Sequence, residues 1–172
     1  MITVTFEIYL NKNNETLNLT EAMLFSELEK YKESVLQREV VDGAIVITAT
    51  EQEKLIVSDE LWAAVQNLCF ESIPVILDEK RETFLYRYTS YDGHLIMIPL
   101  GNMIRFTGEN IPMITVPSKE LFPALYECGK RFISFLSKLE GVESEMVKYL
   151  GPFKESAKNS LIRHQMLPVT GA

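Results

Sequence analysis

The feature that most constrains the fold is a long amphipathic segment at about residues 118–140. Its apolar residues recur at intervals of three and four positions, which predicts an α-helix. They form two adjacent stripes, which are Leu121, Leu125, Cys128, Phe132, Leu136 and Leu139, and Phe122, Tyr126, Gly129 and Ile133. Two stripes give a helix a wide apolar face, so we expect this helix to pack across a sheet at the centre of the core. Gly141 is its expected end.

A second pattern, the alternation of apolar and polar residues, covers residues 83–107. It predicts three consecutive antiparallel strands that form a meander. Asp92-Gly93 is typical of a two-residue type I′ hairpin turn, because both central positions of that turn need a positive φ angle. Such a turn would place Tyr91 opposite His94, and it would put Arg87, Tyr91 and His94 on the face of the hairpin that points away from the core.

Shorter patterns complete the predicted architecture. Strands are expected at residues 4–10, 44–49, 55–57 and 75–77. Helices are expected at residues 20–36, at 59–70 after the capping sequence Ser58-Asp59-Glu60, and at 142–150 and 153–166 on either side of Gly151-Pro152. We therefore expect one α+β domain, residues 1–172, with a mainly antiparallel sheet of five or six strands packed against the 118–140 helix and with C-terminal helices. Residues 166–172 are expected to form a frayed tail.

The negative charge of the chain is concentrated in its first third. The 172 residues include 17 Lys and Arg against 24 Asp and Glu, which gives a net charge of −7. Residues 1–60 contain five basic and twelve acidic residues, a difference of seven, whereas residues 61–172 contain twelve of each. An acidic surface repels phosphates, so neither nucleic acid nor an anionic membrane is an expected partner. Alternatively, the acidic residues only keep the protein soluble.

The sequence lacks motifs for catalysis, cofactors and metals. It contains no Gly-rich phosphate loop, no G-x-G-x-x-G, no G-x-S-x-G and no H-E-x-x-H. Its two histidines, His94 and His164, are too few for a multi-histidine metal site within one chain. Asp92 could orient His94, but the hairpin turn already explains Asp92. We therefore expect no catalytic residue, no cofactor and no metal.

The expected location is the cytoplasm. Cys69 and Cys128 have no second cysteine at short spacing, so we interpret both as small buried hydrophobic residues in a reducing compartment. The first ten residues alternate between apolar and polar side chains, whereas a signal peptide begins with basic residues and continues as an apolar stretch. No apolar run approaches the roughly 20 residues that a membrane-spanning helix needs.

These observations favour a non-enzymatic, soluble binding protein. In its size, its acidity and its lack of catalytic motifs the chain is similar to small acidic bacterial immunity proteins, and this resemblance implies an inhibitor that covers a basic partner protein. The acidic candidates for such binding are Glu27, Glu29 and Glu33, and the hairpin candidates are Arg87, Tyr91 and His94. Arg and Tyr are enriched in protein interfaces. Alternatively, cross-strand pairs of such residues stabilise a hairpin without any partner.

Two other functions are compatible with the sequence. The first is a small-molecule-binding protein or an enzyme of unknown reaction. Its pocket would lie between the meander and the C-terminal helices and would use Tyr91, His94, Arg105 or Glu127. The second is a structural subunit of a homo-oligomer.

Overall fold

The computed structural model describes residues 1–37, 41–141 and 143–169 and has an α+β architecture with two antiparallel sheets. The first sheet has the strand order β2-β1-β3-β4, and the second has the order β5-β6-β7-β8. The strands are β1 (Ile2–Lys12), β2 (Glu15–Thr20), β3 (Asp42–Ala49), β4 (Leu55–Glu60), β5 (Phe84–Arg87), β6 (His94–Leu100), β7 (Met103–Gly108) and β8 (Ile114–Pro117). The predicted α+β class is confirmed, but the strands form two sheets of four instead of one sheet of five or six.

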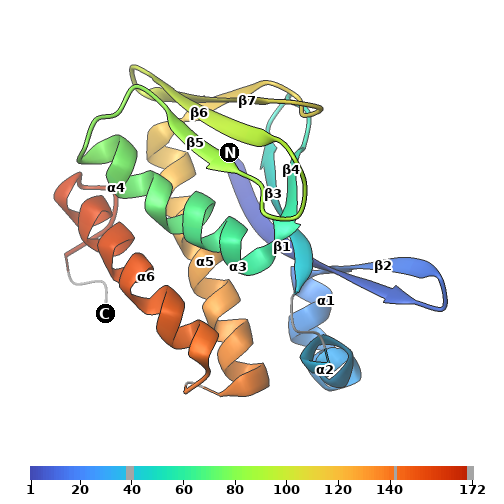
Figure 1. The fold of residues 1–172 in the computed structure, drawn as a ribbon. Coiled ribbons are helices and arrows are strands. Elements are labelled where there is room, and N and C mark those ends of the chain that lie inside the picture. The colour runs from blue at the N-terminus through green and yellow to red at the C-terminus, as the bar shows by residue number, and fades with distance from the viewer. Residues whose placement is uncertain (38–40, 142, 170–172) are drawn as a thin grey trace.

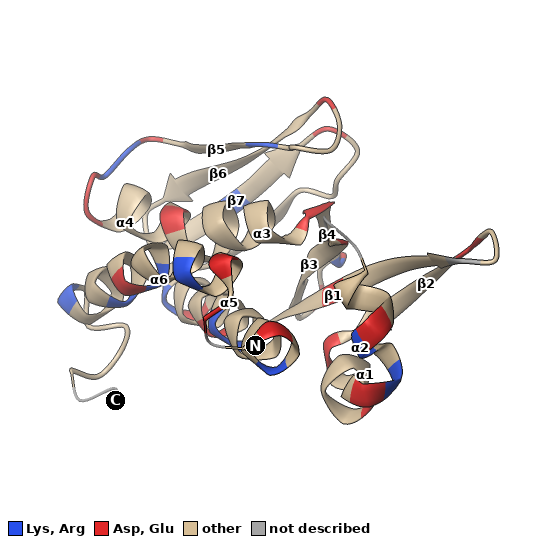
Figure 2. Cartoon of the chain, turned by 60° about the horizontal axis from the view of Figure 1, so that its bottom comes forward, with Lys and Arg blue, Asp and Glu red and all other residues tan. Residues whose placement is uncertain are grey.

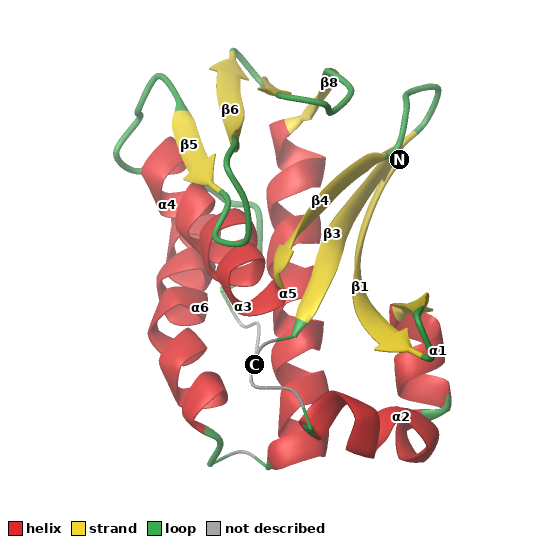
Figure 3. Cartoon of the chain, turned by 45° about the vertical axis from the view of Figure 1, so that its right-hand side comes forward, coloured by secondary structure: helices red, strands yellow, loops and turns green. Residues whose placement is uncertain are grey.

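Helices pack against the inner faces of both sheets. They are α1 (Glu21–Ser26), α2 (Leu28–Leu36), α3 (Leu61–Ala64), the π-helical η1 (Val65–Glu71), α4 (Ser72–Leu77), α5 (Ser118–Glu140) and α6 (Glu145–Arg163). The long central helix is confirmed as α5, which contacts β1 of the first sheet and β7 and β8 of the second (Figure 3). It ends at Gly141, whose φ of 91° is in the left-handed region that favours glycine. Helices α1 and α2 lie below β2, on the side of β1 away from β5–β7 (Figure 1).

One continuous hydrophobic core joins the two sheets to the helices. Phe6 of β1 packs against Phe132 and Phe135 of α5, with ring centroids 5.4 Å and 5.8 Å apart. Tyr86 of β5 and Phe106 of β7 are fully buried in the same core from the second sheet. Burial of these large rings dominates the hydrophobic stabilisation, at roughly 25 cal/mol per Å² of apolar surface.

The strand β2 was not expected from the sequence. Asn13 and Asn14 have φ angles of 53° and 63°, and Lys12 pairs with Glu15, so these two asparagines form a two-residue hairpin turn. Positive φ at both central positions is what a type I′ turn requires, and Asn tolerates it. The Asn-rich stretch therefore joins two strands instead of ending one. Strand β8, which lies between two prolines in the sequence, was also not expected.

The helix expected at residues 59–70 and the strand expected at 75–77 need correction. Strand β4 continues through Glu60, so Ser58-Asp59-Glu60 does not start a helix. The helical conformation begins at Leu61 and continues through η1 and α4 to Leu77. A short apolar run can be a buried helix or a strand, and periodicity alone cannot distinguish the two.

The two predicted C-terminal helices are one helix, α6, which passes through Gly151-Pro152. Proline disfavours a helical residue before it mainly through that residue's Cβ, which glycine lacks. Of the expected frayed tail, residues 170–172 lie outside the described part of the chain. Met166 and Leu167 pack against the core, so this part of the expected tail is ordered.

The hairpin register also differs from the expectation. Arg87, and not Tyr91, lies opposite His94, a shift of four positions. The connection is the loop 88–93, in which only Gly93 has a positive φ, so Asp92-Gly93 does not form a type I′ turn. Because the shift is an even number, the side chains within the paired strands keep the face that alternation predicted for them, whereas Tyr91 lies outside the strand.

Candidate binding face

The second sheet has one face that no other element of the described residues covers. Strands β5–β7 cross the top of the molecule, with helices below them (Figure 1). The strand registers place eleven side chains on the upper side, which we call the outer sheet face. These residues are Leu85, Arg87, His94, Ile96, Ile98, Leu100, Met103, Arg105, Thr107, Thr115 and Pro117. The intervening side chains, such as Tyr86 and Phe106, are buried toward the helices.

The centre of the outer sheet face is aliphatic. Ile96 lies between Leu85 and Thr107 across the strands, and Ile98 lies opposite Arg105. Leu85 is 44% exposed and Leu100 is 40% exposed, although both are large apolar residues. A contiguous exposed apolar patch of this kind is typical of an interaction site, whereas single exposed hydrophobic residues are ordinary.

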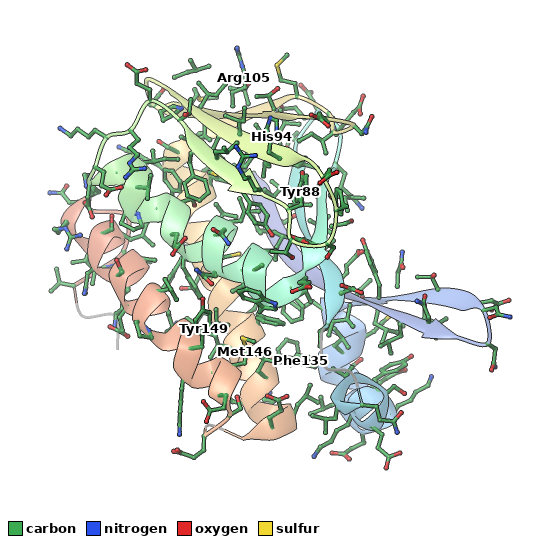
Figure 4. The ribbon with its side chains drawn as sticks, in the orientation of Figure 1. Tyr88, His94, Arg105, Phe135, Met146 and Tyr149 are labelled. Carbon is green, nitrogen blue, oxygen red and sulfur yellow. The ribbon has the colours of Figure 1, made fainter. Side chains whose placement is uncertain are left out.

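The charged residues of the outer sheet face are all basic. Arg87 and His94 lie directly opposite each other on β5 and β6, and Arg105 lies on β7 (Figure 4). The Arg105 side chain donates a hydrogen bond of 3.5 Å to Thr115, and among the described residues neither arginine forms an ion pair. None of the eleven residues is acidic. The face therefore has an apolar centre and a positive charge that the chain does not neutralise there.

Tyr91 does not join this face. Its ring stacks on Tyr88 with centroids 4.6 Å apart, and its hydroxyl donates to the Ser58 carbonyl over 2.8 Å. Burial and the neighbouring tyrosine raise the pKa of Tyr88 to about 12, and burial raises the pKa of Tyr91. Of the three predicted hairpin residues, the structure thus brings together Arg87 and His94 and places Tyr91 against the edge of the first sheet.

Asp59, which the sequence did not identify, fixes this loop. Its buried carboxylate accepts hydrogen bonds from the Tyr86 hydroxyl, from the amide and hydroxyl of Thr89, and from the Ser90 amide. Burial acts to raise the pKa of the Asp59 carboxyl, but these hydrogen bonds outweigh it and hold the pKa below its ordinary value. Because the two amides bind Asp59, they are not available to extend the hairpin ladder.

The predicted acidic residues Glu27, Glu29 and Glu33 lie on and between α1 and α2, away from the outer sheet face (Figure 2). They are exposed, but Lys30 and Lys32 lie among them, and Lys30 pairs with Glu27 at 3.6 Å. Two other acids of the first sixty residues, Glu21 and Asp59, are buried inside the fold. Part of the acidic excess is therefore inside the fold, and Glu27, Glu29 and Glu33 share their surface with two lysines.

The alternative pocket residues are also dispersed. His94 and Arg105 lie on the outer sheet face, Tyr91 lies in the loop 88–93, and Glu127 of α5 pairs with Lys130 at 3.7 Å. A cavity of about 440 Å³ does lie between the meander and the C-terminal helices, but other residues line it. Among the described residues, no three His, Cys, Asp or Glu side chains form a group that could hold a metal ion.

Comparison of the chain with protein-family models, with curated proteins and with solved structures found no match. None of the helices in the described part of the chain combines the length and apolar character that crossing a bilayer requires.

Proposed function

We propose that this chain is a non-enzymatic binding protein, of an inhibitor or immunity type, which docks another protein on the outer sheet face. The observation that supports this proposal is the open aliphatic centre around Ile96 and Ile98, flanked by Arg87, His94 and Arg105 without a nearby acid on the face. An apolar centre with a polar rim is the usual anatomy of an interface, and arginine is enriched among residues that contribute most to binding.

The proposed partner is acidic around an apolar patch. Carboxylates of a partner can pair with Arg87 and Arg105, which have no ion-pair partner among the described residues. The net charge led to the expectation of a basic partner, whereas Arg87 and Arg105 on the outer sheet face favour an acidic one. A cytoplasmic location remains part of the proposal and is supported by the two buried free thiols.

Capture from a native lysate tests the proposal, with three immobilised forms of the full chain compared at low and high salt. The wild type should retain a specific protein, and Ile98→Asp should retain at least tenfold less, because a carboxylate would enter the apolar centre. Arg105→Glu should weaken capture mainly at low salt, where charge attraction is least screened.

Thr5→Asp is the matched control. Thr5 is exposed on β1 of the first sheet, so the same new charge lies outside the outer sheet face. This variant should capture as the wild type does. Equal capture by Ile98→Asp, with an unchanged unfolding midpoint, would contradict the proposal, as would a wild-type chain that retains nothing at either salt concentration.

Light scattering coupled to gel filtration separates this proposal from a homo-oligomer. Two copies that met through their outer sheet faces would bring like charges together, which is unfavourable. We therefore expect a monomer, and a dimer disrupted by Ile98→Asp would show that the face pairs with a second copy instead.

A further inference from the structure

We propose that the cavity between α4, the β6–β7 turn and the start of α5 binds a small organic anion with an apolar body, such as a medium-chain carboxylate. This site is separate from the outer sheet face, and nothing in the protein-docking proposal depends on it.

The cavity has the size and the apolar floor of a ligand site. Its volume is about 440 Å³, and ligand pockets usually measure about 300–1,000 Å³. Leu77 of α4 and Pro99 of β6 are half-buried and contribute apolar surface to its wall, which the buried Ile76, Ile104 and Phe122 complete. A hydrocarbon chain placed there would cover the surface of Leu77 and Pro99 that water now contacts, which is favourable by roughly 25 cal/mol per Å².

The polar groups at the cavity favour an anion. Lys80, Arg81 and His164 line it, and none of the described lining residues is acidic. Two carboxylates lie close by. Asp78 is held by Arg163 at 2.5 Å and by His164 at 2.9 Å, and Glu79 pairs with Arg81 at 3.3 Å.

The local charge balance is nevertheless positive. Arg81 is paired with Glu79 and Arg163 with Asp78, so the charge of Lys80 is the one that these pairs leave unbalanced. Lys80 has no ion-pair partner among the described residues. A carboxylate bound at the rim would neutralise this charge while its chain follows the apolar wall.

The backbone holds Lys80 in place beside the cavity. Asp78 and Glu79 both donate amide hydrogen bonds to the Pro74 carbonyl, over 2.8 Å and 3.0 Å, and Arg81 donates to the Val75 carbonyl over 3.3 Å. The chain turns sharply between these bonds, and Lys80 has a φ of 51°. A lysine rarely adopts this left-handed conformation, so the surrounding bonds keep it there.

A larger cavity, of about 640 Å³, lies beside β5, but its chemistry differs. Glu71 and Glu82 line it together with Arg81, so it offers an anion no net attraction. The smaller cavity is therefore the one that matches an anionic ligand.

Titration with octanoate tests the proposal, followed by amide chemical shifts and by calorimetry at neutral pH. We expect saturable binding in which the shifts centre on Gly101, Ile104 and Lys80. Acetate has the charge without the apolar body, and octanol has the body without the charge, so each should bind at least tenfold more weakly. No saturable binding at millimolar octanoate, or shifts centred on the outer sheet face, would overturn the proposal.

Paired charge variants give the second readout. Lys80→Gln combined with Arg81→Gln should weaken octanoate binding at least tenfold. Lys30→Gln combined with Lys32→Gln changes the net charge equally on α2, far from the cavity, and should leave the affinity unchanged (Figure 2). Ile98→Asp should also bind octanoate normally, which separates failure of this site from failure of the protein-docking proposal. Equal weakening by both charge pairs would show a nonspecific effect and overturn the site.

Discussion

Glu21 and Arg131 meet beside β1 and supply the hydrogen bonds that a neighbouring strand would otherwise make. Arg131 donates to the Glu21 carboxylate and, over 2.7 Å, to the Val4 carbonyl, while the Phe6 amide donates to Glu21 over 3.4 Å. The pairing of β1 with β2 begins only at Glu7, so this edge of β1 would otherwise be open. The ion pair satisfies the exposed backbone groups and ties α1 and α5 to the first sheet.

Arg131→Met should destabilise the protein by about 1–3 kcal/mol, because it leaves the Glu21 carboxylate and the Val4 carbonyl without their donor. The loss of unfolding free energy should be smaller than for a fully buried ion pair, since the Arg131 side chain is 41% exposed and water screens its charge. Urea unfolding measures it. Glu127→Gln is the control: Glu127 pairs on the surface with Lys130, so its loss should lower the free energy of unfolding by less than about 0.5 kcal/mol. Equal losses would contradict the assigned role of Arg131.

Asp59→Asn should lower the free energy of unfolding by about 1.5–3 kcal/mol at neutral pH. The side-chain NH2 group that replaces one carboxylate oxygen cannot accept a hydrogen bond, so one of the two oxygens that now accept from Tyr86, Thr89 and Ser90 is lost together with the negative charge. Tyr86→Phe removes one donor and should cost less. Chemical denaturation of both variants checks that Asp59→Asn loses more unfolding free energy than Tyr86→Phe. An Asp59→Asn variant as stable as the wild type would show that the hydrogen bonds do not fix the loop 88–93.

The same carboxylate makes stability depend on pH in the acid range. The folded pKa of Asp59 lies below its ordinary value of 3.8, so its contribution is fully present above about pH 3.8 and is lost as the pH falls through the folded pKa. Asp78, whose pKa is also lowered because Arg163 and His164 outweigh burial, acts in the same direction. Between about pH 2 and 5, the unfolding temperature should therefore rise less steeply with pH for Asp59→Asn than for the wild type. Parallel curves would contradict this linkage.

Two substitutions to alanine inside helices should have opposite effects. A Cβ at Gly129 would lie 2.6 Å from the Phe70 ring and 3.0 Å from the Cys69 Cβ, so Gly129→Ala should destabilise by about 1–3 kcal/mol through overpacking. Pro152 is exposed within α6 and lacks the amide that a helix uses, so Pro152→Ala should stabilise by about 1–2 kcal/mol. Calorimetry measures both, and a stabilising Gly129→Ala would refute the close contact.

The two cysteines should be unreactive until the protein unfolds. Both are fully buried, and burial together with the neighbouring Cys128 thiol raises the pKa of the Cys69 thiol well above its ordinary value. Only a thiolate attacks a disulfide reagent. Native protein should therefore show almost no reaction with 5,5′-dithiobis(2-nitrobenzoate), and both thiols should react in denaturant. Fast reaction of the folded protein would contradict this burial.

The sequence predicted those helices and strands whose residue pattern lies entirely within one segment. The two stripes of residues 118–140 identified α5, alternation identified β1 and the meander, and an apolar run rich in β-branched residues identified β3. Only the first half of β4 was predicted, at residues 55–57. Sequence patterns gave the wrong secondary structure where a neighbouring element determines the conformation. Val75-Ile76-Leu77 is apolar in either conformation, and its place against α6 makes it helical. Asn13 and Asn14 mark a turn, but only the partner strand β1 turns the residues after them into β2.

The candidate site was predicted in part. Arg87, His94, Ile96 and Ile98 lie on the face that alternation assigned to them. Arg105 joins this face from β7, although the sequence suggested it only for a pocket. Tyr91 does not lie on this face because strand β5 ends at Arg87. The loop 88–93 then bends toward Ser58 and Asp59. These contacts join residues about thirty positions apart, so no pattern within the loop itself predicts them.

The sequence by itself determined which side chains of the meander point toward the core and which point outward. That property depends only on a period of two, and it survived a register shift of four positions. The tertiary structure alone decided the register, the division into two sheets and the partners of the charged residues. A buried carboxylate such as that of Asp59 must find donors wherever the fold brings them, and here they come from Tyr86, Thr89 and Ser90. The net charge of −7 was likewise known from the sequence, but only the fold showed that Glu21 and Asp59 are buried and that the ionisable residues of the outer sheet face are basic.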